Sequence, residues 1–173
     1  MSTRLNPALV HYRYWTPADH ENIRLAGLCL RKNRDVAMSV ISRMPPSIHM
    51  ASGPMTSGGL GSFEANMELF YRTVEYLIVT EKRNAFSQVP FETGMVAFHQ
   101  GWVDLVGKRK YCWPILLEFY EMLFATGKFD TLHFIHGFES SIGARWEYDQ
   151  CLKRGIKIRR LPKSLSHELM KAR

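Results

Sequence analysis

Apolar positions recur along the chain at two spacings, and each spacing predicts one kind of element. After Ser62 they return every three or four residues, as on one face of an α-helix. Shorter apolar runs end at Pro, Gly or a polar turn and have the length of strands. These runs predict strands at 47–52, 84–89, 131–136 and 155–161.

Helical segments separate the predicted strands. The first begins at Ser62, which can cap it, a second opens at Trp113-Pro114 and stops at Gly127, and a third fills the segment after Gly137. The segment 94–106 fits either a helix or a strand. Alternating strands and helices predict an α/β fold, a Rossmann-like (flavodoxin-like) parallel sheet of four to five strands with helices on both faces.

Two further helices are predicted before the first strand. One starts at Thr16-Pro17, where proline suits the first helical position, and the other covers 34–43, stopped by Pro45-Pro46. We therefore expect three parts: an N-terminal helical extension at 1–45, an α/β domain at 46–162 and a C-terminal tail at 163–173.

Length and composition agree with a single globular chain. Its 173 residues can bury a sizeable core, and 46% hydrophobic with 23% charged residues is an ordinary balance. No apolar run approaches the roughly 18 residues of a membrane span, and no signal-type segment opens the chain, so we expect a cytoplasmic protein without membrane contact. Three cysteines without a CxxC pair predict reduced thiols.

The formal net charge of +7 favours anionic partners. Lysine and arginine fall in short groups at 108–110, 153–154 and 157–160, without the interleaved aromatics of a single-strand binding platform. A solvated basic face is the favoured interpretation, and nucleic-acid binding is the weaker alternative.

The loop after the first predicted strand, "SGPMTSGGLGS", contains four glycines. Glycine lets backbone N–H groups approach a phosphate or sugar closely. The loop is neither a Walker A motif nor GxGxxG, so a plain surface loop is an equal alternative. Its place at the carboxyl end of a strand, where such sheets bind ligands, favours a function.

The loop after the third predicted strand leads into a helix whose start carries Ser140, Ser141 and Gly143. Helix N-termini bind anions, although a serine there can simply cap the helix. Further along, Ala144, Tyr148, Cys151 and Leu152 form the stripe expected to face the sheet.

Glu147 flanks that stripe, and periodicity favours a solvated or ion-paired carboxylate over an acid aimed into a pocket. The helical rise places it roughly 9 Å beyond Ser141 along the axis, which leaves room for a sugar phosphate. His133 and His136 lie on opposite faces of a strand, unsuited to one metal, and buried or rim positions are the favoured interpretation. No GxSxG elbow supports a serine hydrolase.

Four motifs in order, "SGPMT", Asn66, "QVPFE" and "FIHGFESSIGARWEYDQCLKRGIKI", resemble the nucleoside 2-deoxyribosyltransferase superfamily over about residues 47–162. The resemblance is closest to its 2'-deoxynucleoside 5'-phosphate N-hydrolases and cytidylate hydrolases, and extends to small, often phage-borne relatives. It implies that Glu147 is the catalytic nucleophile. It also implies a phosphate-binding role for Ser141, where the nucleoside transferases tend to have an aspartate.

The same resemblance implies further substrate contacts and no metal or organic cofactor. These contacts would come from Gly53, Pro54, Met55, Thr56, Ser57, Gly58, Asn66, Ser140 and Gly143. A homodimer or higher homo-oligomer is implied as well.

The chain departs from the family pattern at two positions. Glu118 and Glu121 stand where the family has an aspartate that assists the departing base, and the spacing favours Glu121. Met50 stands where the family usually has a tyrosine that hydrogen-bonds the nucleophile, and Tyr71 or Tyr111 could replace it.

We therefore expect hydrolysis of the N-glycosidic bond of a nucleoside 5'-monophosphate, giving free base and (deoxy)ribose 5-phosphate. A nucleoside 2-deoxyribosyltransferase and a non-catalytic nucleotide-binding module on the same fold are the alternatives. The base and the sugar's 2' substituent stay open.

Overall fold

The computed structural model describes residues 13–56, 58–107 and 111–171, and the chain divides into two compact units. The sheet unit contains the described parts of 45–87 and 128–173, and the helical unit contains those of 14–44 and 88–127. Residues 88–127, which the sequence placed in the α/β domain, thus group with the N-terminal helices. Ser57 and the basic group 108–110 lie outside the described residues.

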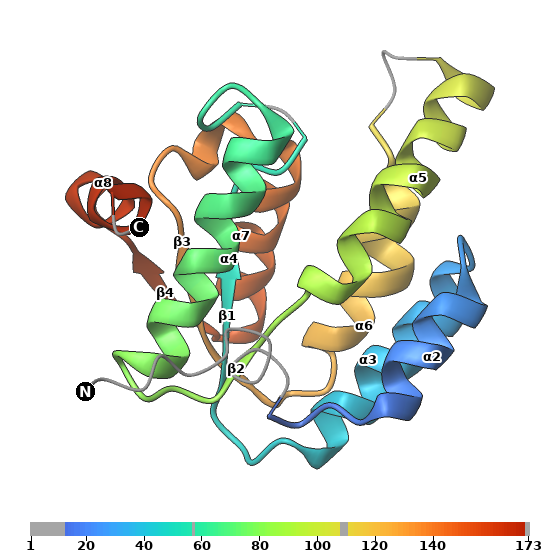
Figure 1. Cartoon of the computed structure of the whole chain (residues 1–173), viewed down its shortest axis with the longest axis horizontal. Coiled ribbons are helices and arrows are strands. Elements are labelled where there is room, and N and C mark those ends of the chain that lie inside the picture. Colours follow the sequence, from blue (N-terminus) through green and yellow to red (C-terminus); the bar gives the residue numbers. More distant parts are fainter. Residues whose placement is uncertain (1–12, 57, 108–110, 172–173) are drawn as a thin grey trace. The chain divides into compact units, whose positions relative to one another are not determined.

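The sheet unit is built on four parallel strands (Figure 1). They are β1 (Ile48–Ser52), β2 (Ala85–Phe86), β3 (Phe129–Phe134) and β4 (Lys157–Arg160), in the order β2-β1-β3-β4. Every residue of the central strand β1 is buried, as expected of a parallel strand covered on both faces. The predicted α/β fold with a parallel sheet is confirmed, with four strands.

Two helices cover the sheet from opposite sides. Helix α4 (Phe63–Val79) connects β1 to β2, and α7 (Ile142–Arg154) connects β3 to β4, which is the opposite direction across the sheet. Because such crossovers are right-handed, opposite directions place the two helices on opposite faces. Figure 1 shows α4 in front of β1 and α7 behind it.

The two loops after β1 and β3 therefore start at neighbouring strands whose connections leave in opposite directions. This is the topological switch point of an α/β sheet, where ligands bind. The sequence predicted both loops but not the strand order that makes them neighbours.

Several element boundaries differ from the prediction: the strand predicted at 131–136 is Phe129–Phe134, and the one predicted at 155–161 is Lys157–Arg160. The strand predicted at 84–89 is only Ala85–Phe86, because Val89 already begins α5 (Val89–Val106) and Pro90 lies in its first turn. Proline is tolerated there because that N–H has no helical acceptor. In addition, the predicted tail contains helix α8 (Lys163–Lys171), where Arg72 Nη1 of α4 donates to the Leu169 carbonyl at 3.1 Å.

A histidine pair lies on the face of the sheet opposite to α7. His49 Nδ1 and His133 Nε2 are 2.8 Å apart, and both residues are buried. Burial, followed by the nearby charges of His49 and Arg159, lowers the pKa of His133 to about 4. The predicted burial of His133 is confirmed, whereas His136 follows the strand and is exposed.

The helical unit starts with α2 (Pro17–Ala26) and α3 (Leu30–Arg43), which confirms the predicted N-terminal helices. The ambiguous segment 94–106 belongs to α5. After Pro114 the chain forms a π-helical turn, η1 (Ile115–Tyr120), which continues as α6 (Glu121–Phe124). Phe91 and Phe119 form an edge-to-face pair in the core of this unit, with ring centroids 5.1 Å apart.

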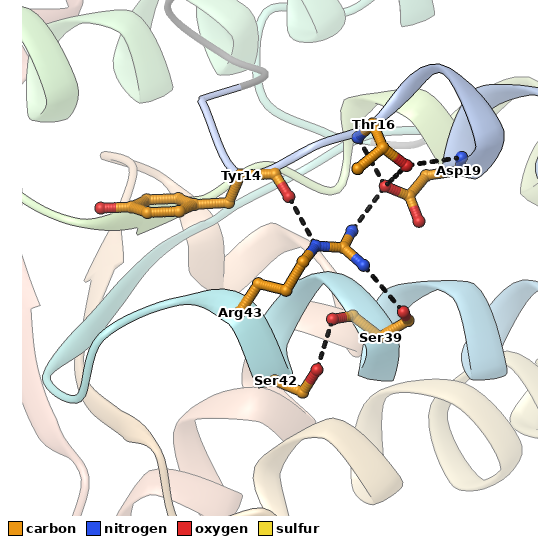
Figure 2. Close-up of polar contacts among 6 residues, drawn as sticks. All are labelled: Tyr14, Thr16, Asp19, Ser39, Ser42 and Arg43. Carbon is orange, nitrogen blue, oxygen red and sulfur yellow. Dashed lines mark hydrogen bonds and ion pairs between the residues drawn. The ribbon is translucent and has the colours of Figure 1, made fainter.

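Asp19 and Arg43 join α2 to the end of α3 (Figure 2). The Asp19 carboxylate accepts from the Thr16 N–H at 2.6 Å and from Arg43 Nη2 at 2.5 Å. Arg43 also donates to the Tyr14 carbonyl and to Ser39 Oγ. Burial acts to raise the pKa of Asp19, but the bonds from Arg43 and Thr16 hold it below its ordinary value.

Replacement of Asp19 by Ala should destabilise the helical unit by about 1–3 kcal/mol, because it removes the capping box and leaves Arg43 without its carboxylate. Urea unfolding followed by tryptophan fluorescence measures this, since Trp15 lies beside α2. Glu21→Ala is the matched control, because Glu21 forms an exposed pair with Arg24 on the same helix. Equal losses in both variants would contradict the assignment.

Candidate functional site

Glu147 lies on the buried face of α7, with 6% of its surface exposed. The predicted solvated or ion-paired position is therefore wrong. The buried positions of this helix are Ala144, Glu147, Gln150 and Cys151, whereas Leu152 is 65% exposed. The segment mixes polar and apolar residues so evenly that the stripe expected from the sequence was wrong at two of its four positions, with Tyr148 and Leu152 expected where Glu147 and Gln150 are found.

The hydroxyl of Ser52 donates a short hydrogen bond to Oε2 of Glu147. Ser52 is the last residue of β1 and is 1% exposed. It lies on the same face of the strand as Met50, because side chains alternate between the faces. Met50 has no hydroxyl to donate, and the donor that contacts Glu147 lies two residues further along the strand. Within the described part of the sheet unit the donor is Ser52 and not Tyr71. Tyr111 lies in the helical unit, and the expectation that it could contribute stays a prediction.

The sequence did not assign Ser52 to the site. A hydroxyl at the end of a buried strand, in register with the position that lacks the tyrosine, was the available signal. The sequence does not show that β1 packs against α7, and this packing joins residues 95 positions apart.

The surroundings of Glu147 favour its neutral form. Burial raises the pKa of Glu147 to about 7, and the hydrogen bond from Ser52 acts in the opposite direction. Both the acid and the carboxylate are therefore populated near neutral pH. Burial and the charge of Glu147 raise the pKa of Cys151 to about 12, so this thiol stays protonated and is a poor nucleophile.

The glycine loop after β1 contacts the loop after β3. The N–H of Gly59 donates to Ser140 Oγ at 3.1 Å, and that hydroxyl donates to the Gly137 carbonyl at 2.8 Å. Gly58 has a φ of 73°, and a Cβ there would collide with the Ser140 side chain. Gly58 is thus required both by its left-handed conformation and by the close approach of the two loops.

Asn66, in the first turn of α4, forms hydrogen bonds to the backbone of the same loop. It is 4% exposed, and its Oδ1 accepts from the Leu60 N–H at 2.8 Å. Its Nδ2 donates to the Met55 carbonyl at 3.2 Å and to the Gly58 carbonyl at 3.1 Å. Both amide hydrogens are used within the protein, so in this structure Asn66 shapes the loop.

Ser141 caps α7, with its Oγ accepting from the Ala144 N–H at 3.3 Å. A hydroxyl that accepts in this way keeps its own hydrogen for a further acceptor. The N–H groups of Ile142 and Gly143 belong to the first turn, where the helix supplies no acceptors. The cap and the anion-binding interpretation are therefore compatible.

The other predicted site residues are divided between the units. Pro54, Met55 and Thr56 follow β1 in the loop that Asn66 holds, and Pro54 is buried there. Glu121, the predicted acid for the departing base, begins α6 in the helical unit. Its role stays a prediction.

A buried carboxylate with a raised pKa, at the switch point of a parallel sheet, has the features of a nucleophile or a general acid–base.

In the described ranges, no group of three or more His, Cys, Asp or Glu side chains is placed to hold a metal ion. No helix within those ranges is both long and apolar enough to cross a membrane. No protein-family model, curated protein or solved structure significantly matches the chain.

Glu147→Gln should stabilise the protein at alkaline pH, because it removes a buried negative charge while keeping an oxygen that can accept from Ser52. The carboxyl pKa is about 7 in the fold against an ordinary 4.5, so the stability that Glu147 contributes is present below about pH 4.5 and is lost as the pH rises to 7. The gain over wild type should reach about 3 kcal/mol at pH 8 and be small near pH 4.5.

Urea unfolding at both pH values measures this difference. Asp149→Asn is the matched control, because it makes the same kind of change at an exposed carboxylate on the same helix. A Glu147→Gln gain that is the same at both pH values would refute a perturbed carboxyl.

Proposed function

We propose that this protein cleaves the N-glycosidic bond of a nucleoside 5'-monophosphate and releases the free base and (deoxy)ribose 5-phosphate. The observation that carries the proposal is the buried Glu147 carboxylate, bonded to Ser52 beside a glycine-rich loop. The order and spacing of the sequence motifs support it, because they resemble the nucleotide-hydrolysing branch of the nucleoside 2-deoxyribosyltransferase superfamily.

In this mechanism Glu147 acts as the nucleophile. As the bond between C1' and the base nitrogen breaks, the sugar acquires oxocarbenium character and a carboxylate oxygen of Glu147 bonds to C1'. The electron pair of the broken bond leaves with the base, which takes up a proton. Water then attacks C1' of the glycosyl-enzyme and releases one proton to solvent, which balances the proton taken up by the base, while the sugar phosphate leaves and the carboxylate is restored.

The start of α7 is the proposed phosphate site. A phosphate there would accept from the Ser141 hydroxyl and from the N–H groups of the first turn, and the helix dipole favours its charge. Ser140 contributes indirectly, because its hydroxyl bonds the glycine loop to the turn before α7. The formal net charge of +7 agrees with an anionic substrate.

Two parts of the proposal rest on the family resemblance alone. They are the assistance of Glu121 to the departing base and assembly as a homodimer or higher oligomer. Neither of them enters the argument for Glu147.

Incubation with a panel of ribo- and deoxyribonucleoside monophosphates should release free base from at least one of them. Glu147→Gln should lower that rate on the order of a thousandfold or more, because amide nitrogen and oxygen are poor nucleophiles. Chromatography of the free bases and assay of the sugar phosphate measure both products, with Asp149→Asn as the control. Absence of base release from every nucleotide and nucleoside would overturn the enzymatic proposal.

Two other results would identify the alternatives. Exchange with an added second base would indicate a transferase. Thermal stabilisation by a nucleotide without turnover would indicate a non-catalytic binding module.

Ser141→Asp separates phosphate binding from helix capping. Aspartate caps helices as well as serine does, so α7 should keep its start, but its charge repels a phosphate. We expect KM for the nucleotide substrate to rise at least about tenfold while the melting temperature changes little. Steady-state kinetics and thermal melts measure the two effects. An unchanged KM would exclude phosphate binding at this serine.

A further inference from the structure

The bond between Ser52 and Glu147 distinguishes the two oxygens of the carboxylate. Oε2 accepts the Ser52 hydroxyl, and no described residue donates a hydrogen bond to Oε1. Both side chains are buried, at 1% and 6% exposure, so water does not substitute easily for either partner. Oε2 is thus held by a hydrogen bond, and Oε1 is left to react with a substrate.

We propose that Ser52 is the positioning residue of this site: its hydroxyl holds Oε2 of Glu147 and directs Oε1 toward the substrate. This inference rests on the proposed function for the identity of the substrate. The part that concerns the carboxylate itself can be measured without any substrate.

The backbone makes Ser52 suitable for this task. Its carbonyl accepts from the Ile135 N–H at 2.8 Å, so the end of β1 is fixed against the chain that leaves β3. β1 is a central strand, paired with β2 and β3. A serine hydroxyl on such a support has one rotatable bond to its oxygen, so it can fix the carboxylate more sharply than a donor on a mobile loop.

The hydroxyl also offsets part of the effect of burial. A buried carboxylate without a donor is disfavoured against its neutral acid, whereas a hydrogen bond to the charged form favours ionisation. Ser52 is the side-chain donor that lowers the pKa of Glu147 against burial. Because only the ionised form is nucleophilic, losing this donor should reduce activity most at low pH and least at high pH.

The test compares Ser52→Ala, which removes the donor, with Ser52→Thr, which keeps it. Thr73→Val is the matched control, because Thr73 is a buried hydroxyl of α4 that bonds the Leu69 carbonyl. The first measurement is the protonation midpoint of Glu147 by infrared difference spectroscopy, with Glu147→Gln identifying the band. The second is the pH dependence of kcat/KM for a nucleotide that the wild type cleaves.

Ser52→Ala should move the midpoint and the acidic limb of kcat/KM upward by about one pH unit. Ser52→Thr should return both toward the wild-type positions, and Thr73→Val should leave the midpoint in place. A merely structural serine would lower stability without moving either quantity. An unmoved midpoint in Ser52→Ala would overturn the proposal.

The two measurements separate this inference from the proposed function. A shifted midpoint in a protein that cleaves no nucleotide supports the role of Ser52 and rejects the N-glycosidase. Nucleotide cleavage with the same acidic limb in wild type and Ser52→Ala supports the N-glycosidase and rejects the role of Ser52.

Discussion

Burial of one carboxylate is the constraint around which the sheet unit is arranged. A charge removed from water is costly unless a donor meets it, and the donor here stands at the end of the strand that α7 covers. The sheet, the helix and the loop after β1 all have to keep their places for this contact to persist. The burial that makes Glu147 unfavourable for the fold is also what gives it a pKa suited to chemistry near neutral pH.

The sheet topology concentrates the remaining chemistry at the same place. Chain connections that leave β1 and β3 in opposite directions put two loops side by side, and Ser140 bonds one to the other. Asn66 then fixes the glycine loop through three bonds to its backbone. The described residues of both loops are therefore held by hydrogen bonds within the protein, and the entropy of fixing these residues is lost on folding and not on binding.

Local chemistry made much of the fold predictable. The helix starts at Thr16, Ser62 and Ser141 depend on side chains a few residues away, and the alternation of strands and helices indicated the parallel sheet. The direction of Glu147 was not predictable, because α7 has only a weakly separated apolar face. Ser52 was missed for a different reason: its partner is brought to it by sheet pairing and helix packing, which no local pattern records.

The histidine pair and Glu147 lie on opposite faces of one sheet. Acid changes the stability that each contributes in opposite directions. His133 binds its proton less readily in the fold than its ordinary pKa of 6.5 implies, so the stability it contributes is complete above that pH and declines toward pH 4. Glu147 contributes most below pH 4.5 and loses that contribution by pH 7. Between these limits the two effects oppose each other, so each cancels part of the pH dependence that the other would give to the stability of the sheet unit.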